Sequence, residues 1–467
     1  MSTWLDQNIE VFRKILSLPL GVAQSANYEL MSLLQTLADI KILSFSSNSE
    51  VNGWIVPENC RVEVAKISSG GELLFDGTKH PLAVIANSRS FSGKVDKSTL
   101  ENHVFYSRLE PESFAFHCTN NYRPWSSDWG FCVPWTEFSK WEYETFDIDL
   151  RTVFEPSEML VGVYELSGES EDTVVFNAHT CHPTQFEDGF SGIAAILEVM
   201  EYLSGLKNRR FTYRAIFAPE HIGTVFYLHN LSVAERSKIK AAVFTEMIGL
   251  NQPLAVQESF SGTHGIDRVA RKIAYELEPG SRIGEFRSIV GNDETVWEAP
   301  GYEIPCISIS RCFESPFYYS GYHTSADRIE HSNFERRSAA IRYLQTVVSV
   351  FETDMIPKRK FEGLVALSNP RYDLYVRRPD PTVPTEISES QVRLGEAQDK
   401  ILRYLNGELS VFEISEIMDL PFDTILQYLR KFEDKGLIVL EPAVGVQSLL
   451  NRQATVAQTM KVQQPRN

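Results

Sequence analysis

The chain has 467 residues, of which 43% are hydrophobic and 11% aromatic, enough apolar material for two or three folded units. Its 45 basic and 62 acidic residues give a net charge of −17, which argues against nucleic acid or an anionic membrane surface as the main partner. The six cysteines form no C-x-x-C pair, and no apolar run is long enough to cross a membrane. We therefore expect a cytoplasmic protein with reduced thiols.

The first part of the chain favours helices and then β-structure. Apolar residues recur at helical spacing between Ile9 and Leu16, and a second helical run extends from Tyr28 to Ile42. In residues 51–155, short β-prone runs such as RVEVAKI and LAVIA are separated by Gly, Pro, Ser and Asn. These residues are expected to form an inserted β-rich domain.

Residues 156–368 alternate between strands and helices. The run TVVFNA (173–178) precedes SGIAAILEVMEYLSGL, RAIFAP (214–219) precedes HIGTVFYLHNL, and AAVFTEMIG (241–249) and PCISIS (305–310) follow. This alternation predicts an α/β fold with a sheet sandwiched by helices and a ligand site at the carboxyl ends of the strands. We expect one catalytic domain built from residues 1–50 and 156–368.

The C-terminal part is expected to be separate. Residues 369–392 are rich in Pro, Ser and charge, which is typical of a linker. Residues 393–445 have the helix, helix-turn-helix, strand rhythm of a winged helix-turn-helix domain, and residues 446–467 are expected to form a flexible tail. Residues 393–442 hold six basic and ten acidic side chains, so we expect this domain to pack on the catalytic domain or a partner, not on DNA.

Side chains that bind metals gather at the ends of the predicted strands. They are His179, Cys181, His182, Asp188, Glu220, His221, Glu246 and His323. Histidine, aspartate and glutamate on one rim of a sheet form the ligand set expected for zinc or a similar divalent ion. A glutamate outside the ligand set could act as general base on a metal-bound water.

Individual members of this group also have ordinary structural interpretations. Asp188 stands where an aspartate can cap the helix that begins near Ser191. Glu246 could be a buried acid paired with an arginine. The shared placement at strand ends is what favours a metal site.

The order of these residues resembles the co-catalytic zinc aminopeptidase superfamily, which also contains glutaminyl cyclases and runs H-x-D, D-x-x-S-G, E-E, D-M and a late H. A nearer resemblance is to a bacterial aminopeptidase-like family with an inserted β domain and a C-terminal winged helix. Its loop C-H-P-[ST]-x-x-N-D-x-x-S-G is similar to CHPTQFEDGFSG (181–192). Other similar stretches are GWIVP (53–57), WGFC (129–132), PEHIG (219–223), GNDE (291–294) and YHTSADR (322–328). The resemblance covers nearly the whole chain and implies a zinc-exopeptidase-like fold.

The resemblance also implies roles for the matching positions. Asp188 matches the aspartate that bridges two metals, Glu220 matches the general base, and His323 matches the terminal histidine ligand. Glu246 stands where the superfamily has a metal-binding aspartate. Glutamate is one methylene longer, and its carboxylate can still reach the metal.

Other positions depart from the superfamily pattern. His221 replaces the second glutamate of E-E as a candidate ligand, and Cys181 replaces the supporting aspartate of H-x-D, so the usual orienting partner of a ligand histidine is missing. The superfamily pattern selects His179 as the first ligand, whereas the nearer family selects His182, which we favour. Both histidines can bind. Because of these departures, the sequence does not establish that a second metal binds, and we expect one firmly held zinc.

Three further residues are expected on the substrate side of the site. Asp293 and Glu294 could hold a substrate ammonium, and Arg311 could grip a carboxylate with two hydrogen bonds. The alternative for Asp293 is a turn residue, and for Arg311 a structural salt bridge.

We therefore predict a zinc-dependent aminopeptidase-like hydrolase of peptides or small amides, in which Glu220 activates a metal-bound water. One alternative is a non-peptide amide hydrolase or acyl transferase in a biosynthetic pathway. Another is a non-catalytic metal-binding regulatory or interaction protein. No membrane or nucleic-acid partner is expected, and a homo-oligomer is left open.

Overall fold

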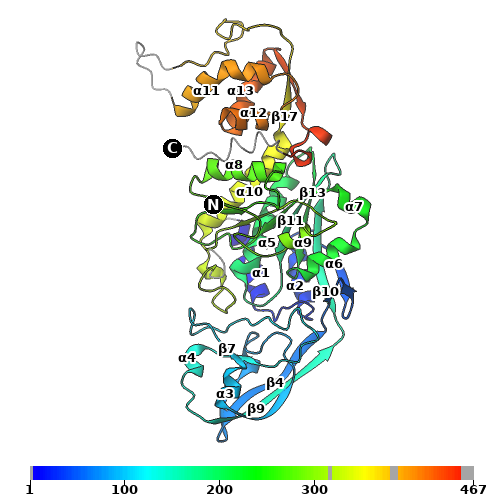
Figure 1. The fold of residues 1–467 in the computed structure, drawn as a ribbon, viewed down its shortest axis with the longest axis vertical. Helices are drawn as coiled ribbons and strands as arrows, with labels where there is room; N and C mark the ends of the chain where they lie inside the picture. Colours follow the sequence, from blue (N-terminus) through cyan, green and yellow to red (C-terminus); the bar gives the residue numbers. More distant parts are fainter. Residues whose placement is uncertain (1–3, 314–317, 379–387, 454–467) are drawn as a thin grey trace. The chain divides into compact units, whose positions relative to one another are not determined.

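The computed structural model describes residues 4–313, 318–378 and 388–453 (Figure 1). The chain divides into two compact units, one of residues 1–262 and 280–342 and the other of residues 263–279 and 343–467. All the candidate site residues lie in the first unit. The domain boundaries expected from the sequence stay predictions.

An eight-stranded mixed sheet forms the centre of the first unit. Its strands, in spatial order, are β1 (Lys41–Ser46), β10 (Glu158–Leu166), β12 (Thr212–Ala218), β11 (Thr173–His179), β13 (Ile239–Thr245), β16 (Cys306–Ser310), β14 (Ala255–Gln257) and β15 (Arg282–Gly284). The consecutive neighbours β12, β11, β13 and β16 are parallel, whereas β10 and β14 run antiparallel beside them. The carboxyl ends of four adjacent strands therefore share one edge of the sheet.

Helices cover both faces of this sheet, as Figure 1 shows. On one face, Val175 and Phe244 of the strands share a core with Tyr227 of α6 (Ile222–Asn230) and Trp297 of α9 (Glu294–Trp297). Successive residues of a strand point to opposite faces. The residues before and after Val175 in β11 therefore point to the other face of the sheet, where α5 (Ser191–Ser204) contacts β11, β12 and β13. The predicted α/β sandwich is confirmed.

The N-terminal helices are α1 (Trp4–Leu16) and α2 (Asn27–Gln35). The expectation of a helix running on to Ile42 is wrong, because α2 ends at Gln35 and Lys41 begins β1. Strand β1 pairs antiparallel with β10, and its Leu43 and Phe45 pack against the core of the sheet. Pairing and burial of this edge strand override its helical spacing. The first unit also contains α7 (Val233–Lys238), whereas the residues of α10 (Phe334–Thr353) are divided between the two units.

The β-rich segment holds its own sheet within the first unit. Four antiparallel strands lie in the order β5 (Glu72–Asp76), β4 (Asn59–Ser69), β9 (Thr145–Glu155) and β6 (Phe91–Asp96). They enclose a core that includes Ile67, Trp129, Phe131 and Phe146. The smaller elements are β2 (Glu50–Val51), β3 (Trp54–Ile55), β7 (Val104–Phe105), β8 (Phe131–Cys132), α3 (Lys97–Glu101) and α4 (Trp135–Phe138).

A short piece of this segment pairs with the loop that carries His323. The backbone N–H of Phe116 donates to the carbonyl of His323 at 2.7 Å, and that of Ser325 donates to the carbonyl of Phe114 at 2.8 Å. The Ser325 hydroxyl also accepts from the N–H of Phe114 at 3.0 Å. The segment therefore helps to fix the loop of a candidate ligand.

The second unit contains α8 (Gly265–Leu277), α11 (Glu389–Ile401), α12 (Val411–Met418), α13 (Phe422–Asp434) and a two-stranded sheet of β17 (Met355–Arg359) and β18 (Ile438–Pro442). The assignment of its C-terminal part as a winged helix stays a prediction. Residues 379–387 of the expected linker lie outside the described residues.

The described residues include the first part of the expected tail, residues 446–453. Short 3-10 helices form at Gly445–Gln447 and Leu449–Asn451, because Leu449 and Leu450 are buried and Ser448 caps the second of them. Residues 454–467 of the tail lie outside the described part. Among the helices of the described residues, none has both the length and the apolar content for a membrane span.

Candidate active site

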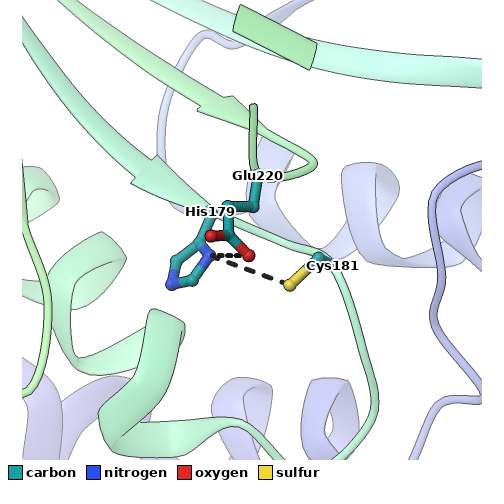
Figure 2. Close-up of side chains that lie close together, drawn as sticks. All are labelled: His179, Cys181 and Glu220. Atoms are coloured by element: carbon teal, nitrogen blue, oxygen red, sulfur yellow. Dashed lines mark hydrogen bonds and ion pairs between the residues drawn. The ribbon is translucent and has the colours of Figure 1, made fainter. Parts of the chain in front are cut away.

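Three adjacent parallel strands place acidic and imidazole groups at one edge of the sheet. His179 is the last residue of β11, Glu220 follows β12 by two residues, and Glu246 directly follows β13. Figure 2 shows the side chains of His179 and Glu220 facing each other at these strand ends. The backbone is strained beside them, with positive φ of 55° at His221 and 52° at Met247. Such strain is concentrated at functional sites.

The first donor cluster consists of His182, Asp188 and His323. The Nε2 atoms of His182 and His323 lie 3.2 and 3.6 Å from the same oxygen, Oδ2 of Asp188. The side chains of His182 and Asp188 are buried, whereas that of His323 is 30% exposed. This opening gives a solvent-side approach to the cluster.

The second donor cluster consists of His179, Asp188 and Glu246, all buried. The Nε2 atom of His179 lies 3.1 Å from Oε2 of Glu246 and 3.7 Å from Oδ1 of Asp188, and it also contacts the backbone carbonyl of Asp188. Asp188 thus belongs to both clusters and faces each with a different carboxylate oxygen. Its side chain does not cap α5, whose first turn has no side-chain cap.

Glu220 lies beside the second cluster with a partly open side chain. Its Oε2 atom is 4.0 Å from Nδ1 of His179 (Figure 2). Its Oε1 atom is 3.4 Å from Nδ1 of His221. The side chain of Glu220 is 20% exposed, whereas that of Glu246 is 1% exposed. Glu220 is therefore the carboxylate at this edge that a substrate and water can reach.

Cys181 occupies the position of the orienting partner that the sequence comparison suggested was missing. Its sulfur lies 3.2 Å from Nδ1 of His182 and 3.7 Å from Nδ1 of His179. The thiol donates to Oε1 of Gln185 at 3.4 Å, which leaves the sulfur lone pairs for the two imidazole N–H groups. One thiol can thus orient both rings, with their Nε2 atoms facing the donor clusters.

Burial sets the charge of the clustered groups. It lowers the pKa of His182 well below its ordinary range and that of His323 to about 4, so both imidazoles are neutral. Burial raises the pKa values of Asp188 and Glu246, which lie close to each other and to Glu220. For His179, burial lowers the pKa, but the nearby Cys181, Glu246 and Asp188 outweigh it and raise the pKa.

The donor set fits a divalent metal ion. Oδ2 of Asp188 is buried and has no hydrogen-bond donor among the described residues. Buried carboxylate oxygens without donors are costly unless a cation lies near them. Together with the neutral imidazoles of His182 and His323, the carboxylates of Asp188 and Glu246 form the nitrogen and oxygen ligand set that zinc prefers.

The remaining predicted site residues lie around these clusters. His221 is in none of the donor groups found among the described residues, although its ring lies next to Glu220. Asp293 is fully buried, and its two oxygens accept from the backbone N–H of His221 and the hydroxyl of Thr224. Its carboxylate therefore holds the turn that carries Glu220, a contact with a distant segment that neither interpretation from the sequence included.

Glu294 and Arg311 are also fully buried. Both oxygens of Glu294 accept from the backbone N–H of Asn292 at 2.9 Å, and burial raises the pKa of Glu294 to about 8. Nη1 of Arg311 donates to the carbonyl of Gln252 at 2.9 Å. The substrate contacts expected for these residues stay predictions.

Aromatic residues of the β-rich segment also line the site and were missed as site residues. Phe116 stacks on the ring of His182 with centroids 4.0 Å apart, and Trp54 stacks on the ring of His221 at 6.0 Å. The stretch GWIVP, which includes Trp54, is the sequence feature that could have identified this residue as part of the site. Trp129 belongs to the core of the β-rich segment, and Trp125 is 67% exposed.

The central sheet and its helices define the α/β fold of zinc aminopeptidases. The zinc aminopeptidase BSAP of Bacillus subtilis superposes with a TM-score of 0.53 at 13% identity, covering 73% of this chain and 94% of that one. A peptidase M28 precursor of Shewanella amazonensis superposes with a TM-score of 0.51 at 13% identity over 73% and 92% of the two chains. At these identities the likeness shows the fold.

The chain belongs to the family described as a domain of unknown function, DUF4910, whose model matches residues 11–354. A structure described as a "putative peptidase" from Clostridium acetobutylicum has a TM-score of 0.75 at 19% identity, covering 93% of this chain and 96% of that one. A protein of the same organism is named "Putative polysaccharide biosynthesis protein with aminopeptidase-like domain". It is 26% identical over 68% of this chain and 72% of its own length.

Proposed function

We propose that the chain is a metal-dependent amide hydrolase of aminopeptidase type. The observation that carries this proposal is the position of Asp188, which faces two donor clusters with its two carboxylate oxygens while Glu220 lies beside them. A carboxylate shared between two donor sets is the arrangement expected for a pair of metal ions.

The two clusters would hold the metal. His182, Asp188 and His323 supply one set of ligands, and His179, Asp188 and Glu246 supply the other. Zinc bound there would act as a Lewis acid on the scissile carbonyl and lower the pKa of water at the site. The sequence predicts one firmly held zinc, whereas the second donor cluster supports two zinc ions per chain.

Glu220 would move the proton. Its partly exposed carboxylate can accept a proton from the attacking water and donate it to the leaving amine, since both transfers occur on the open side of the donor clusters. Asp293 supports this role because it fixes the backbone of the turn between Glu220 and Thr224. Cys181 and Gln185 hold the two histidines behind the reacting groups.

Peptides and small aminoacyl amides are the first substrate class. The fold of the zinc aminopeptidases supports this choice. The second candidate is an amide bond in a non-peptide molecule, favoured by the relative named as a polysaccharide biosynthesis protein with an aminopeptidase-like domain. Both candidates use the same bond cleavage and differ in the group recognised beside it.

A substrate panel tests the proposal. The zinc-loaded protein is incubated with aminoacyl amides, dipeptides and N-acylated amino sugars, with Asp188→Ala as the matched inactive variant. We expect release of an amine from at least one class, and none with the variant. A folded protein that holds zinc and hydrolyses neither class would contradict the proposal and favour the non-catalytic alternative.

A further inference from the structure

A cavity of about 470 Å³ lies next to the candidate active site but is not lined by its acids. Its wall comes from the N-terminal segment around Gln24, from β4 and from the residues between β5 and β6. Cys181 and Pro183, the two neighbours of His182, complete the wall together with Phe116, which stacks on the His182 ring. Its volume is in the range of small-molecule sites, which runs from about 300 to 1,000 Å³.

The lining of this cavity has an unusual charge balance for so acidic a chain. No aspartate or glutamate of the described residues lines it, although the chain carries 62 acidic residues. Its two basic side chains lie at the rim: Arg61 is half exposed and pairs with Glu63 at 3.0 Å, and Lys79 is exposed. The interior therefore offers neither a carboxylate for a cation nor an unpaired cationic group for an anion.

Amide side chains dominate the polar part of the interior. Asn59, Asn87 and Asn121 line it together with Gln24, whose amide bonds the Cys60 backbone and Oδ1 of Asn59. The other polar lining residues are His80 and the exposed Ser17, Ser25 and Thr78. Each amide both donates and accepts hydrogen bonds, so a complementary ligand must do the same at several positions. Neutral hydroxyl groups meet this requirement.

Two of these amides have hydrogen-bonding capacity that the described protein leaves unused. Asn121 is 3% exposed, and its backbone N–H donates to the carbonyl of Cys118 at 2.8 Å, which leaves its side-chain amide available. Asn59 is 8% exposed, and its Oδ1 accepts from the N–H of Ser25 at 3.1 Å, which leaves its amide nitrogen for another acceptor. Neither amide has an atom that is both fully buried and without a partner among the described residues, so a ligand in the cavity can reach these groups and pair with them.

The cavity also has an apolar wall. Leu82 and Ile85 are almost completely buried and line it beside Val84. A ring that carries hydroxyl groups at its edge and C–H groups on its faces would match both the apolar wall and the amides. We propose that this cavity binds a neutral polyhydroxylated ring of the pyranose type, next to the loop that carries His182.

The test is a binding titration of the full chain by ligand-observed saturation-transfer NMR. The probes are methyl glucopyranoside and N-acetylglucosamine as neutral sugars, glucosamine as a cation and glucuronate as an anion. We expect the neutral sugars to bind and the cation to bind at least tenfold more weakly. Preferred binding of glucuronate, or no binding of either neutral sugar to the folded chain, would overturn the proposal.

Two variants place the binding in the cavity. Asn121→Leu keeps the side-chain volume and breaks no internal hydrogen bond of the described residues, so we expect a folded protein with about tenfold weaker binding. Ala86→Phe fills the cavity and should abolish binding. Unchanged affinity in a folded Asn121→Leu protein would contradict the assignment.

A third variant separates this site from the proposed hydrolase. Glu220→Gln should bind the neutral sugars with unchanged affinity, because Glu220 does not line the cavity. An inactive wild-type protein that binds sugars would contradict the proposed hydrolysis alone. An active protein that binds none of them would contradict the cavity proposal alone.

Discussion

The carboxylate of Asp327 holds the backbone of Asp188. Its Oδ2 atom accepts the N–H of Asp188 at 3.1 Å and its Oδ1 atom accepts the N–H of Glu187 at 2.8 Å, while the Tyr319 hydroxyl donates to Oδ2 at 2.8 Å. Asp188 lies in a single π-helical turn, Phe186–Phe190, at the start of α5. Such turns are rare and recur at functional sites. Asp327 therefore determines where the shared carboxylate lies.

We predict that Asp327→Asn weakens metal binding about 10- to 100-fold, the usual effect of losing a group that positions a ligand. An asparagine has one acceptor oxygen, so one of the two N–H groups loses its partner. The measurement is a zinc competition titration. Tyr319→Phe, which removes only the hydroxyl contact, should have a smaller effect, and equal effects of the two variants would contradict this role.

Glu220→Gln should keep the metal and lose turnover. The amide retains the shape of the side chain but cannot accept a proton, so we expect the rate to fall about 10²- to 10⁴-fold. Metal analysis and turnover of the substrate found by the panel check this together. Glu201→Gln, on the exposed face of α5, is the matched control and should remain fully active. Full activity of Glu220→Gln would exclude it as the base.

The number of zinc ions that each variant retains should depend on which donor cluster has lost a ligand. After loading with zinc and removal of the excess, Asp188→Ala should retain no metal, because both clusters lose a ligand. His182→Ala and Glu246→Ala should each lose one ion of two, and His221→Ala should lose none. The measurement is mass spectrometry of the metals per chain. Loss of metal from His221→Ala but not from His182→Ala would reverse the assignment.

Cys181→Ala should weaken metal binding about 10- to 100-fold, because His179 and His182 both lose the atom beside their Nδ1. Cys181→Ser should recover part of this loss, since a hydroxyl oxygen can accept from the imidazole N–H. The absorption spectrum of the cobalt-loaded protein reports the ligand geometry separately from affinity. Identical spectra and affinities for all three proteins would show that the sulfur does not orient the histidines.

Gly192→Ala should destabilise the first unit. A Cβ at this position would lie 1.9 Å from the carbonyl oxygen of Thr245, the residue before Glu246, so α5 and β13 would have to separate. We expect a loss of about 1–3 kcal/mol in the free energy of unfolding, measured with denaturant. Gly205→Ala, at the other end of α5, meets only the Tyr202 carbonyl at 3.4 Å and should cost far less. Equal losses would contradict this explanation.

Much of the fold and of the candidate site could be predicted from the sequence. The strand ends carry His179, Glu220 and Glu246 because apolar runs define the strands and polar residues follow them directly. The glycine of the D-x-x-S-G pattern, Gly192, also has a physical reason, because a larger residue would not fit between α5 and the Thr245 backbone.

Other features could not be predicted because they depend on contacts between distant parts of the chain. The sequence offered His179 and His182 as alternatives, whereas the structure places them in separate clusters on the two oxygens of Asp188. The sulfur of Cys181 reaches both rings only because the loop folds back over Gln185. Strand β1 was missed because its pairing with β10 is formed by residues far apart in the chain.

The pairing of Phe116 with His323 has a consequence for how the protein can be shortened. Deleting residues 51–155 would leave the backbone N–H and carbonyl groups of residues 323–325 without their partners and would expose the His182 ring. A protein shortened in this way should fold poorly around the candidate ligands. The β-rich segment and the candidate metal site should therefore be kept together when the protein is shortened or transplanted.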